Sequence, residues 1–162
     1  MFELWGQLVD AICRPPRDDA YTTADLIGGE NGKFRIAPSF NGCREDITLV
    51  SLAWHTMHGS YYTYHSHAMA LQTNKKGLKL VCSHFLPVDA KGKDGRLPCV
   101  IYCHCNSGSR RDAEEAVYIL VPLGVSVFTL DFAGSGLSEG KFVTLGASEV
   151  DDVEVRIAAP AA

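Results

Sequence analysis

The sequence predicts an α/β protein with a mostly parallel sheet and flanking helices. Cys99 to Cys103 (CVIYC) is a continuous apolar run, which is typical of a strand buried on both faces of a parallel sheet. Asp112 to Leu123 places apolar residues at helical spacing, and Val125 to Leu130 (VSVFTL) is a second run of the buried-strand type. A strand, a helix and a strand within about thirty residues form a βαβ unit, whose two strands are parallel.

The first ninety or so residues are less regular. Apolar residues recur at helical spacing from Met1 to Cys13, which predicts an amphipathic helix that packs on the protein's own core, and Pro15-Pro16 ends it. Short strands are expected at Phe34 to Ile36, Ile47 to Trp54 and Leu78 to Leu86, because these segments are rich in β-branched or apolar residues. This region therefore predicts one helix and three strands.

His55 to Asn74 interrupts this pattern, since it holds four of the six histidines and three tyrosines without a clear period. We interpret it as an inserted loop. A zinc site needs three or four ligands that neighbouring groups hold in place. No paired cysteines, carboxylates or regular helix frame the imidazoles of His55, His58, His65 and His67. A solvated loop is the favoured interpretation, and no metal and no cofactor is predicted.

The second half also carries signals for the ends of its helices. Ser109, with Asp112 three residues later, predicts the beginning of the first helix, and Gly124 predicts its end. Another helix is expected to begin near Ser148 and to cover Glu149 to Ile157.

Two loops follow predicted strands of the βαβ unit. Residues 104–111 follow the first strand, and residues 131–140 follow the second. Ligands of open α/β sheets bind beyond the carboxyl ends of the strands. Small residues in such loops leave backbone N–H groups able to face an anion. These loops are therefore the candidate functional region.

Composition excludes several classes of protein. A length of 162 residues favours a single domain over residues 1–162. Lys and Arg total 15 against 19 Asp and Glu, and this net charge of −4 argues against a nucleic-acid partner. No apolar run approaches the ~18 residues of a membrane span. The first residues also lack the pattern of a secretory signal, so we expect a cytoplasmic chain with six reduced cysteines.

The motifs of the second half, taken in order, resemble a known superfamily. CVIYCHCNSGSRRDA resembles the strand and HGxSG-type oxyanion loop of α/β-hydrolases, in particular serine aminopeptidase-like and monoacylglycerol-lipase-like members. LDFAGSGLSEG resembles their D-x-x-G-x-G-x-S-x-G loop, and VTLGASEVDD resembles the segment before the following helix. The resemblance covers Pro98 to Asp152 well. RPPR at Arg14 to Arg17 and CSHFLP ending at Pro87 extend it patchily to the N-terminal region of plant- and protist-type members.

The resemblance implies a partial α/β-hydrolase fold and an ancestral serine hydrolase of acyl esters or amides. Asn106 matches the residue whose backbone N–H helps to form the oxyanion hole, and Cys105 and His104 complete this candidate site. His104 matches a histidine that shapes the loop rather than transferring protons. Cys105 stands where the family has glycine, and a cysteine lets the backbone approach a substrate less readily. Four further residues match the loop after the next strand: Asp131, Gly134, Gly136 and Ser138.

Gly136 to Gly140 also satisfies the G-x-S-x-G pattern of a nucleophile elbow. An elbow turns directly from a strand into a helix, whereas a loop precedes Gly136 and residues 141–146 do not favour a helix. The catalytic acid and histidine should follow the nucleophile, yet no histidine follows His104. We therefore assign no catalytic residue, and expect an N-terminal half that stops before the elbow.

Cys103 and Cys105 form a C-x-C pair around His104, which raises the question of thiol chemistry. A nucleophilic cysteine needs a base within reach. Because residues two apart on a strand share a face, His104 is expected to point away from both. We therefore expect Cys103 to be buried in the core and Cys105 to pack in the loop.

Two functions remain open at this point. The first is a hydrolase-family chain that is inactive by itself because the nucleophile, acid and histidine are missing. Its full-length relatives would act on a small-molecule acyl ester or amide. The second is a non-catalytic interaction module, a truncated isoform or a gene-model fragment. An incomplete sheet exposes an edge strand, and that edge favours self-association.

Overall fold

The computed structural model describes residues 2–13, 16–37, 40–49, 76–88 and 96–158. The predicted insertion at residues 55–74, with its four histidines, lies outside these residues, as does the end of the strand expected at Ile47 to Trp54. Among the described helices, none has both the length and the apolar character needed to cross a membrane.

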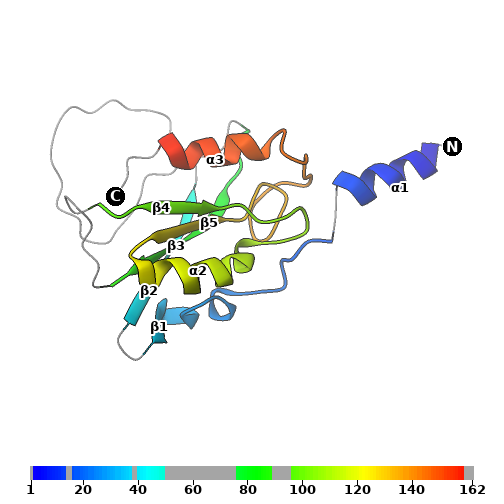
Figure 1. The fold of residues 1–162 in the computed structure, drawn as a ribbon. Helices are drawn as coiled ribbons and strands as arrows, with labels where there is room; N and C mark the ends of the chain where they lie inside the picture. The colour runs from blue at the N-terminus through cyan, green and yellow to red at the C-terminus, as the bar shows by residue number, and fades with distance from the viewer. Residues whose placement is uncertain (1, 14–15, 38–39, 50–75, 89–95, 159–162) are drawn as a thin grey trace.

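Five strands form one mixed sheet, and helices lie on both of its faces (Figure 1). The strands are β1 (Lys33–Ala37), β2 (Phe40–Leu49), β3 (Leu80–Pro87), β4 (Cys99–Tyr102) and β5 (Ser126–Leu130). The helices longer than one turn are α1 (Phe2–Cys13), α2 (Glu114–Leu120) and α3 (Glu149–Ala158). The α/β class and the flanking helices are confirmed.

The order of the strands is β1-β2-β3-β5-β4, and their directions differ from the expectation of a mostly parallel sheet. β1 with β2, β2 with β3, and β3 with β5 are antiparallel, while β4 with β5 is parallel. Parallel neighbours need a crossover connection, usually a helix. Among the described strands, only β4 and β5 are joined through such a helix, α2, as the βαβ prediction requires.

The alternation of side chains along the central strands divides the core between the two faces. On one face, Phe85 and Val127 pack with Val117 of α2. On the other, Leu80 and Phe128 belong to a second cluster, against which Val153 of α3 packs. All five residues of β5 are buried, as its apolar run predicted.

The same prediction is wrong for β4. Cys99 and Val100 are exposed, and Ile101 and Tyr102 are only partly buried. β5 lies between two strands, whereas β4 is one of the two outer strands of the described sheet. An apolar run therefore marks both strands, but only the one with neighbours on each side is buried.

The N-terminal helix forms where predicted but does not pack on the core. Trp5 is 66% exposed and Leu4 is 75% exposed, and α1 projects away from the sheet (Figure 1). A hydrogen bond from the Val143 N–H to the Cys13 carbonyl, 2.9 Å long, joins the last residue of α1 to the body. Helical spacing identifies an apolar face, but it does not say what covers that face.

The predicted ends of the first helix of the βαβ unit are confirmed. The Ser109 hydroxyl accepts a hydrogen bond from the Arg111 N–H, and Gly124 takes a left-handed conformation with φ of 77°. Between them, α2 is flanked by a 3-10 turn on each side.

Candidate functional site

The candidate site consists of two loops at one edge of the sheet. We call residues 103–109 the β4 loop and residues 131–140 the β5 loop. Because β4 and β5 are parallel neighbours, both loops leave the sheet at the same edge. The structure therefore brings together the two segments that the sequence motifs singled out.

Both ring nitrogens of His104 are hydrogen-bonded, one to each loop. Its Nε2 lies 3.1 Å from the backbone nitrogen of Phe132, and its Nδ1 lies 2.7 Å from the carbonyl oxygen of Cys105. A backbone N–H can only donate, so Nε2 accepts and Nδ1 carries the proton that bonds to the carbonyl. The buried His104 ring also packs on the Phe132 ring, with the two ring centroids 4.8 Å apart. His104 therefore fixes the β4 loop against the β5 loop.

Asn106 lies in an exposed turn of the β4 loop. A hydrogen bond of 3.0 Å from the Gly108 N–H to the Cys105 carbonyl closes this turn. Within the described ranges, no group accepts a hydrogen bond from the backbone N–H of Asn106. Asn106 itself is exposed to solvent.

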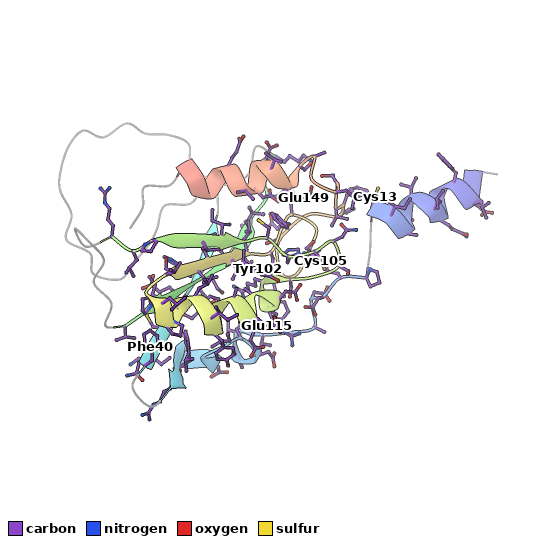
Figure 2. The ribbon with its side chains drawn as sticks, in the orientation of Figure 1. Cys13, Phe40, Tyr102, Cys105, Glu115 and Glu149 are labelled. Carbon is purple, nitrogen blue, oxygen red and sulfur yellow. The ribbon has the colours of Figure 1, made fainter. Side chains whose placement is uncertain are left out.

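One of the two cysteines of the β4 loop differs from the sequence expectation. Cys103 is exposed, so its expected burial in the core is wrong, whereas Cys105 lies in the loop with its sulfur near Gly108. Figure 2 shows Cys105 beyond the end of β4, which carries Tyr102. The chain leaves the sheet at this point, so the alternation that would bury Cys103 no longer applies. Partial burial still raises the pKa of the Cys103 thiol.

Asp131 is a fully buried carboxylate at the beginning of the β5 loop. One of its oxygens accepts from the Arg110 N–H at 2.7 Å. The other accepts from the Tyr21 hydroxyl at 2.5 Å and from the Leu137 N–H at 2.8 Å. Burial, with help from the bond to Asp131, raises the pKa of Tyr21 well above its usual range. Asp131 thus connects the β5 loop to the 3-10 turn at Arg110 and to the N-terminal segment, and holds a structural position.

Arg110 is the buried cation of this network. Its Nη1 donates to the Cys82 carbonyl at 2.9 Å and to the Ser83 hydroxyl at 3.0 Å, and it lies 3.5 Å from Asp46. Its Nε donates to the Tyr21 oxygen at 3.1 Å. Sequence reasoning missed Arg110 and Tyr21. An arginine directly after the predicted helix cap was the available signal, but arginine is usually exposed.

The glycines of the β5 loop have conformations that a side chain would oppose. Gly136 has φ of +47°, and a Cβ there would lie 2.2 Å from Cγ of Asp131. Gly134 has φ of +87°, and a Cβ there would lie 2.5 Å from the Phe142 carbonyl oxygen. A glycine is therefore required at 136 by the close approach of Asp131 and at 134 by the close approach of the Phe142 backbone.

The hydroxyl of Ser138 is engaged in the packing of the β5 loop. It donates to the Asp131 carbonyl at 2.6 Å and accepts from the Val81 N–H of β3 at 2.8 Å. The residue is buried, with 2% of its surface exposed. Its hydroxyl proton and an oxygen lone pair are thus used inside the protein.

Arg17 and Asp18 hold the N-terminal segment against both loops. The Arg17 guanidinium donates to the carbonyls of Gly136 at 2.6 Å and of Gly140 and Ser135 at 3.2 Å, and also to that of Ser138. Asp18 accepts from the Ser109 hydroxyl at 2.6 Å. The RPPR motif is visible in the sequence, but the role of its last arginine depends on contacts with residues more than 100 positions away.

No metal centre is evident in the described part of the chain. None of its groups of His, Cys, Asp and Glu could hold a metal ion with three or more ligands. A surface hollow at the start of α2 is predominantly acidic, with the lining residues Asp18, Arg111, Asp112, Glu114, Glu115 and Tyr118.

Comparison with known proteins identifies the fold. No family model and no curated protein sequence matches this chain. Its structure is similar to that of an esterase from Pyrococcus furiosus in two crystal forms. In one the TM-score is 0.52 at 19% identity, with 90% of this chain and 40% of the esterase covered. In the other it is 0.53 at 21% identity, with 88% and 40% covered. The chain thus spans about 40% of the esterase's length and shares a hydrolase-like fold with it.

Proposed function

We propose that the β4 and β5 loops form the oxyanion-binding part of a serine-hydrolase site for small-molecule acyl esters or amides. The observation that carries the proposal is the exposed Asn106 turn, which His104 fixes against the β5 loop through the Phe132 N–H. The fold shared with an esterase supports it. So does the order of the hydrolase-like motifs from Pro98 to Asp152.

An oxyanion site works by placing donors where negative charge develops on a carbonyl oxygen. One such donor contributes about 3–4 kcal/mol in enzymes where it has been removed. The contribution depends on a donor that is already in position, because reorientation during the reaction would cost free energy. The two hydrogen bonds of His104 and the turn at Cys105 hold the Asn106 N–H in this way.

We further propose that these 162 residues alone do not hydrolyse esters. Nucleophilic catalysis by serine needs a base within hydrogen-bond reach. The Ser138 hydroxyl is instead bonded to the Asp131 carbonyl and the Val81 N–H, and no histidine follows it in the sequence. In this proposal the nucleophile, acid and histidine come from outside these residues, and the chain works in the cytoplasm.

Titration of the labelled chain with butyrate, a product of ester hydrolysis, tests the oxyanion site by amide NMR. The amides of Ser107 and Gly108 should shift and saturate as the carboxylate binds beside them. Asn106→Pro removes the backbone N–H at the second position of a turn, where proline is tolerated. We expect this variant to lose the saturable shifts, and the matched Asn106→Ala variant to keep them. The proposal is wrong if the proline variant keeps them or if the unsubstituted chain shows none.

The outer position of β4 favours a second function, self-association through this strand. Val100 is apolar and exposed, and the outer backbone groups of β4 face no strand of the described sheet. Open edge strands are templates for pairing. We propose a second copy of the chain as the partner. Light scattering after size exclusion should then show a dimer, and Val100→Lys should return a monomer. A monomer at every concentration of the unsubstituted chain contradicts this.

A further inference from the structure

A cysteine and a histidine meet at the beginning of β4, away from the two loops. Sγ of Cys99 lies 3.9 Å from Nε2 of His84, which is within hydrogen-bond distance for sulfur. The residues come from strands that are not neighbours, because β5 lies between β3 and β4 (Figure 1). His84 is opposite Phe128 on β5, and Cys99 is opposite Ser126. The histidine therefore reaches across the middle strand to the cysteine.

The two partners differ in burial in a way that suits a reactive thiol. His84 is 6% exposed, and its ring packs edge-to-face on the Phe128 ring with centroids 5.9 Å apart. Cys99 is exposed to solvent. Its thiol also lies 3.8 Å from the Val100 carbonyl oxygen. The buried imidazole of His84 thus faces the sulfur of a cysteine that is exposed to solvent.

A thiol is a weak nucleophile until its proton is removed, and a neighbouring imidazole can accept that proton. Cys103 is a natural comparison, because it is also exposed and comes only four positions later. Burial raises the pKa of the Cys103 thiol, which disfavours its reactive form. Cys105 provides a second exposed thiol for comparison.

We propose that Cys99 is a site of reversible S-thiolation by low-molecular-weight disulfides, with His84 as its base. As the Cys99 Sγ–H bond breaks, the proton passes to Nε2 of His84. Sγ then forms a bond to one sulfur of the disulfide, and the S–S bond of that disulfide breaks. The departing thiolate takes the proton from His84. Cys99 is oxidised to a mixed disulfide, and half of the reagent is reduced to a thiol. This inference does not rest on the proposed hydrolase function.

The test is incubation of the full chain with oxidised glutathione, acid quenching and mass spectrometry of the peptides at successive times. We expect Cys99 to be modified on the order of a hundredfold faster than Cys103 and Cys105 in the same sample, the lower end of what a positioned base contributes. His84→Gln should reduce the rate at Cys99 to that of Cys103 and leave the other exposed thiols unchanged. The buried Cys82 reports on folding, since it reacts only if the variant unfolds.

The relative rates of modification of the exposed cysteines in the unsubstituted chain test the proposal even if His84→Gln unfolds. Equal rates at Cys99, Cys103 and Cys105 in that chain overturn the proposal. So does a folded His84→Gln variant in which Cys99 keeps its full rate.

Discussion

The Tyr21 hydroxyl stands between the two charged groups of the buried network. It donates to Asp131 at 2.5 Å and accepts from Nε of Arg110 at 3.1 Å. Without it, Arg110 loses an acceptor inside the protein, where an unsatisfied donor costs about 1–3 kcal/mol. A single hydroxyl from the N-terminal segment therefore stabilises the base of both loops.

Tyr21→Phe should lower the free energy of unfolding by about 1–3 kcal/mol at neutral pH. The difference should shrink in alkaline solution. Because the pKa of Tyr21 is raised in the folded protein, its contribution is complete below the ordinary tyrosine pKa of about 10 and is lost as the pH rises above it. Urea unfolding of both proteins at neutral pH and near pH 11 measures this. A difference that stays constant or grows with pH would contradict the buried hydrogen bond.

Two glycines allow two contributions to the free energy of unfolding to be measured separately: the strain of a left-handed backbone and the steric overlap of an added side chain. Gly136 and Gly124 both have positive φ, but a Cβ on Gly124 meets nothing within 4 Å, whereas one on Gly136 overlaps Asp131. Gly124→Ala should cost about 1 kcal/mol for the left-handed conformation alone. Gly136→Ala should cost about 3 kcal/mol, since the buried carboxylate must also move. Equal losses in denaturant unfolding would show that the β5 loop does not fold over Asp131.

At the scale of elements, the turn before α3 depends on Glu149 (Figure 2). The Glu149 carboxylate accepts from the Thr144 hydroxyl at 2.6 Å, the Thr144 N–H at 2.7 Å and the Gly146 N–H at 2.8 Å. Burial alone would raise the pKa of Glu149, but these hydrogen bonds hold it at about 2. The carboxylate thus orders the turn from which α3 begins.

Glu149→Gln should destabilise the protein near neutral pH and lose this effect in acid. Because the folded-state pKa is lowered, the contribution of Glu149 is present above about pH 4.5 and is lost as the pH falls through about 2. Allowing for solvent screening, we expect about 1 kcal/mol. Thermal unfolding across this range measures it, with the exposed Glu30→Gln as the control. If the stability of both variants, relative to the unsubstituted chain, changes with pH in the same way, Glu149 does not order the turn as described.

The elements illustrate what the sequence contains and what it does not. The βαβ unit was predictable because Ser109 and Gly124 mark the helix ends between two apolar runs. The exposure of β4 was not predictable, because an apolar run does not reveal whether its strand has one neighbouring strand or two. The separation of α1 from the core has the same origin, since the spacing of Leu4 and Trp5 specifies a face but no partner.

At the scale of the whole molecule, the sheet brings distant motifs to one edge. The proximity of the β4 and β5 loops was predictable because parallel strands place their carboxyl ends together. The side chains that hold these loops in place were not predictable. Arg17 and Tyr21 lie more than 100 residues in sequence from the β5 loop groups that they contact. Contacts at such separations are set by the tertiary fold, and local patterns do not encode them.

The molecule as a whole shares a hydrolase-like fold with part of an esterase, and its Ser138 hydroxyl is bonded inside the protein. We propose that these residues alone do not hydrolyse esters. The bonding of Ser138 matters because Gly136 to Gly140 matches the sequence motif of a nucleophile elbow. The backbone there does not turn from a strand directly into a helix, as an elbow does.

The hydrolysis of p-nitrophenyl butyrate by the purified chain tests this claim most directly. The measurement compares the unsubstituted chain, its Ser138→Ala variant and buffer. We predict that both proteins match the buffer rate, because the Ser138 hydroxyl is bonded to the Asp131 carbonyl and the Val81 N–H and has no histidine after it in the sequence. Turnover by the unsubstituted chain that Ser138→Ala abolishes would contradict the account.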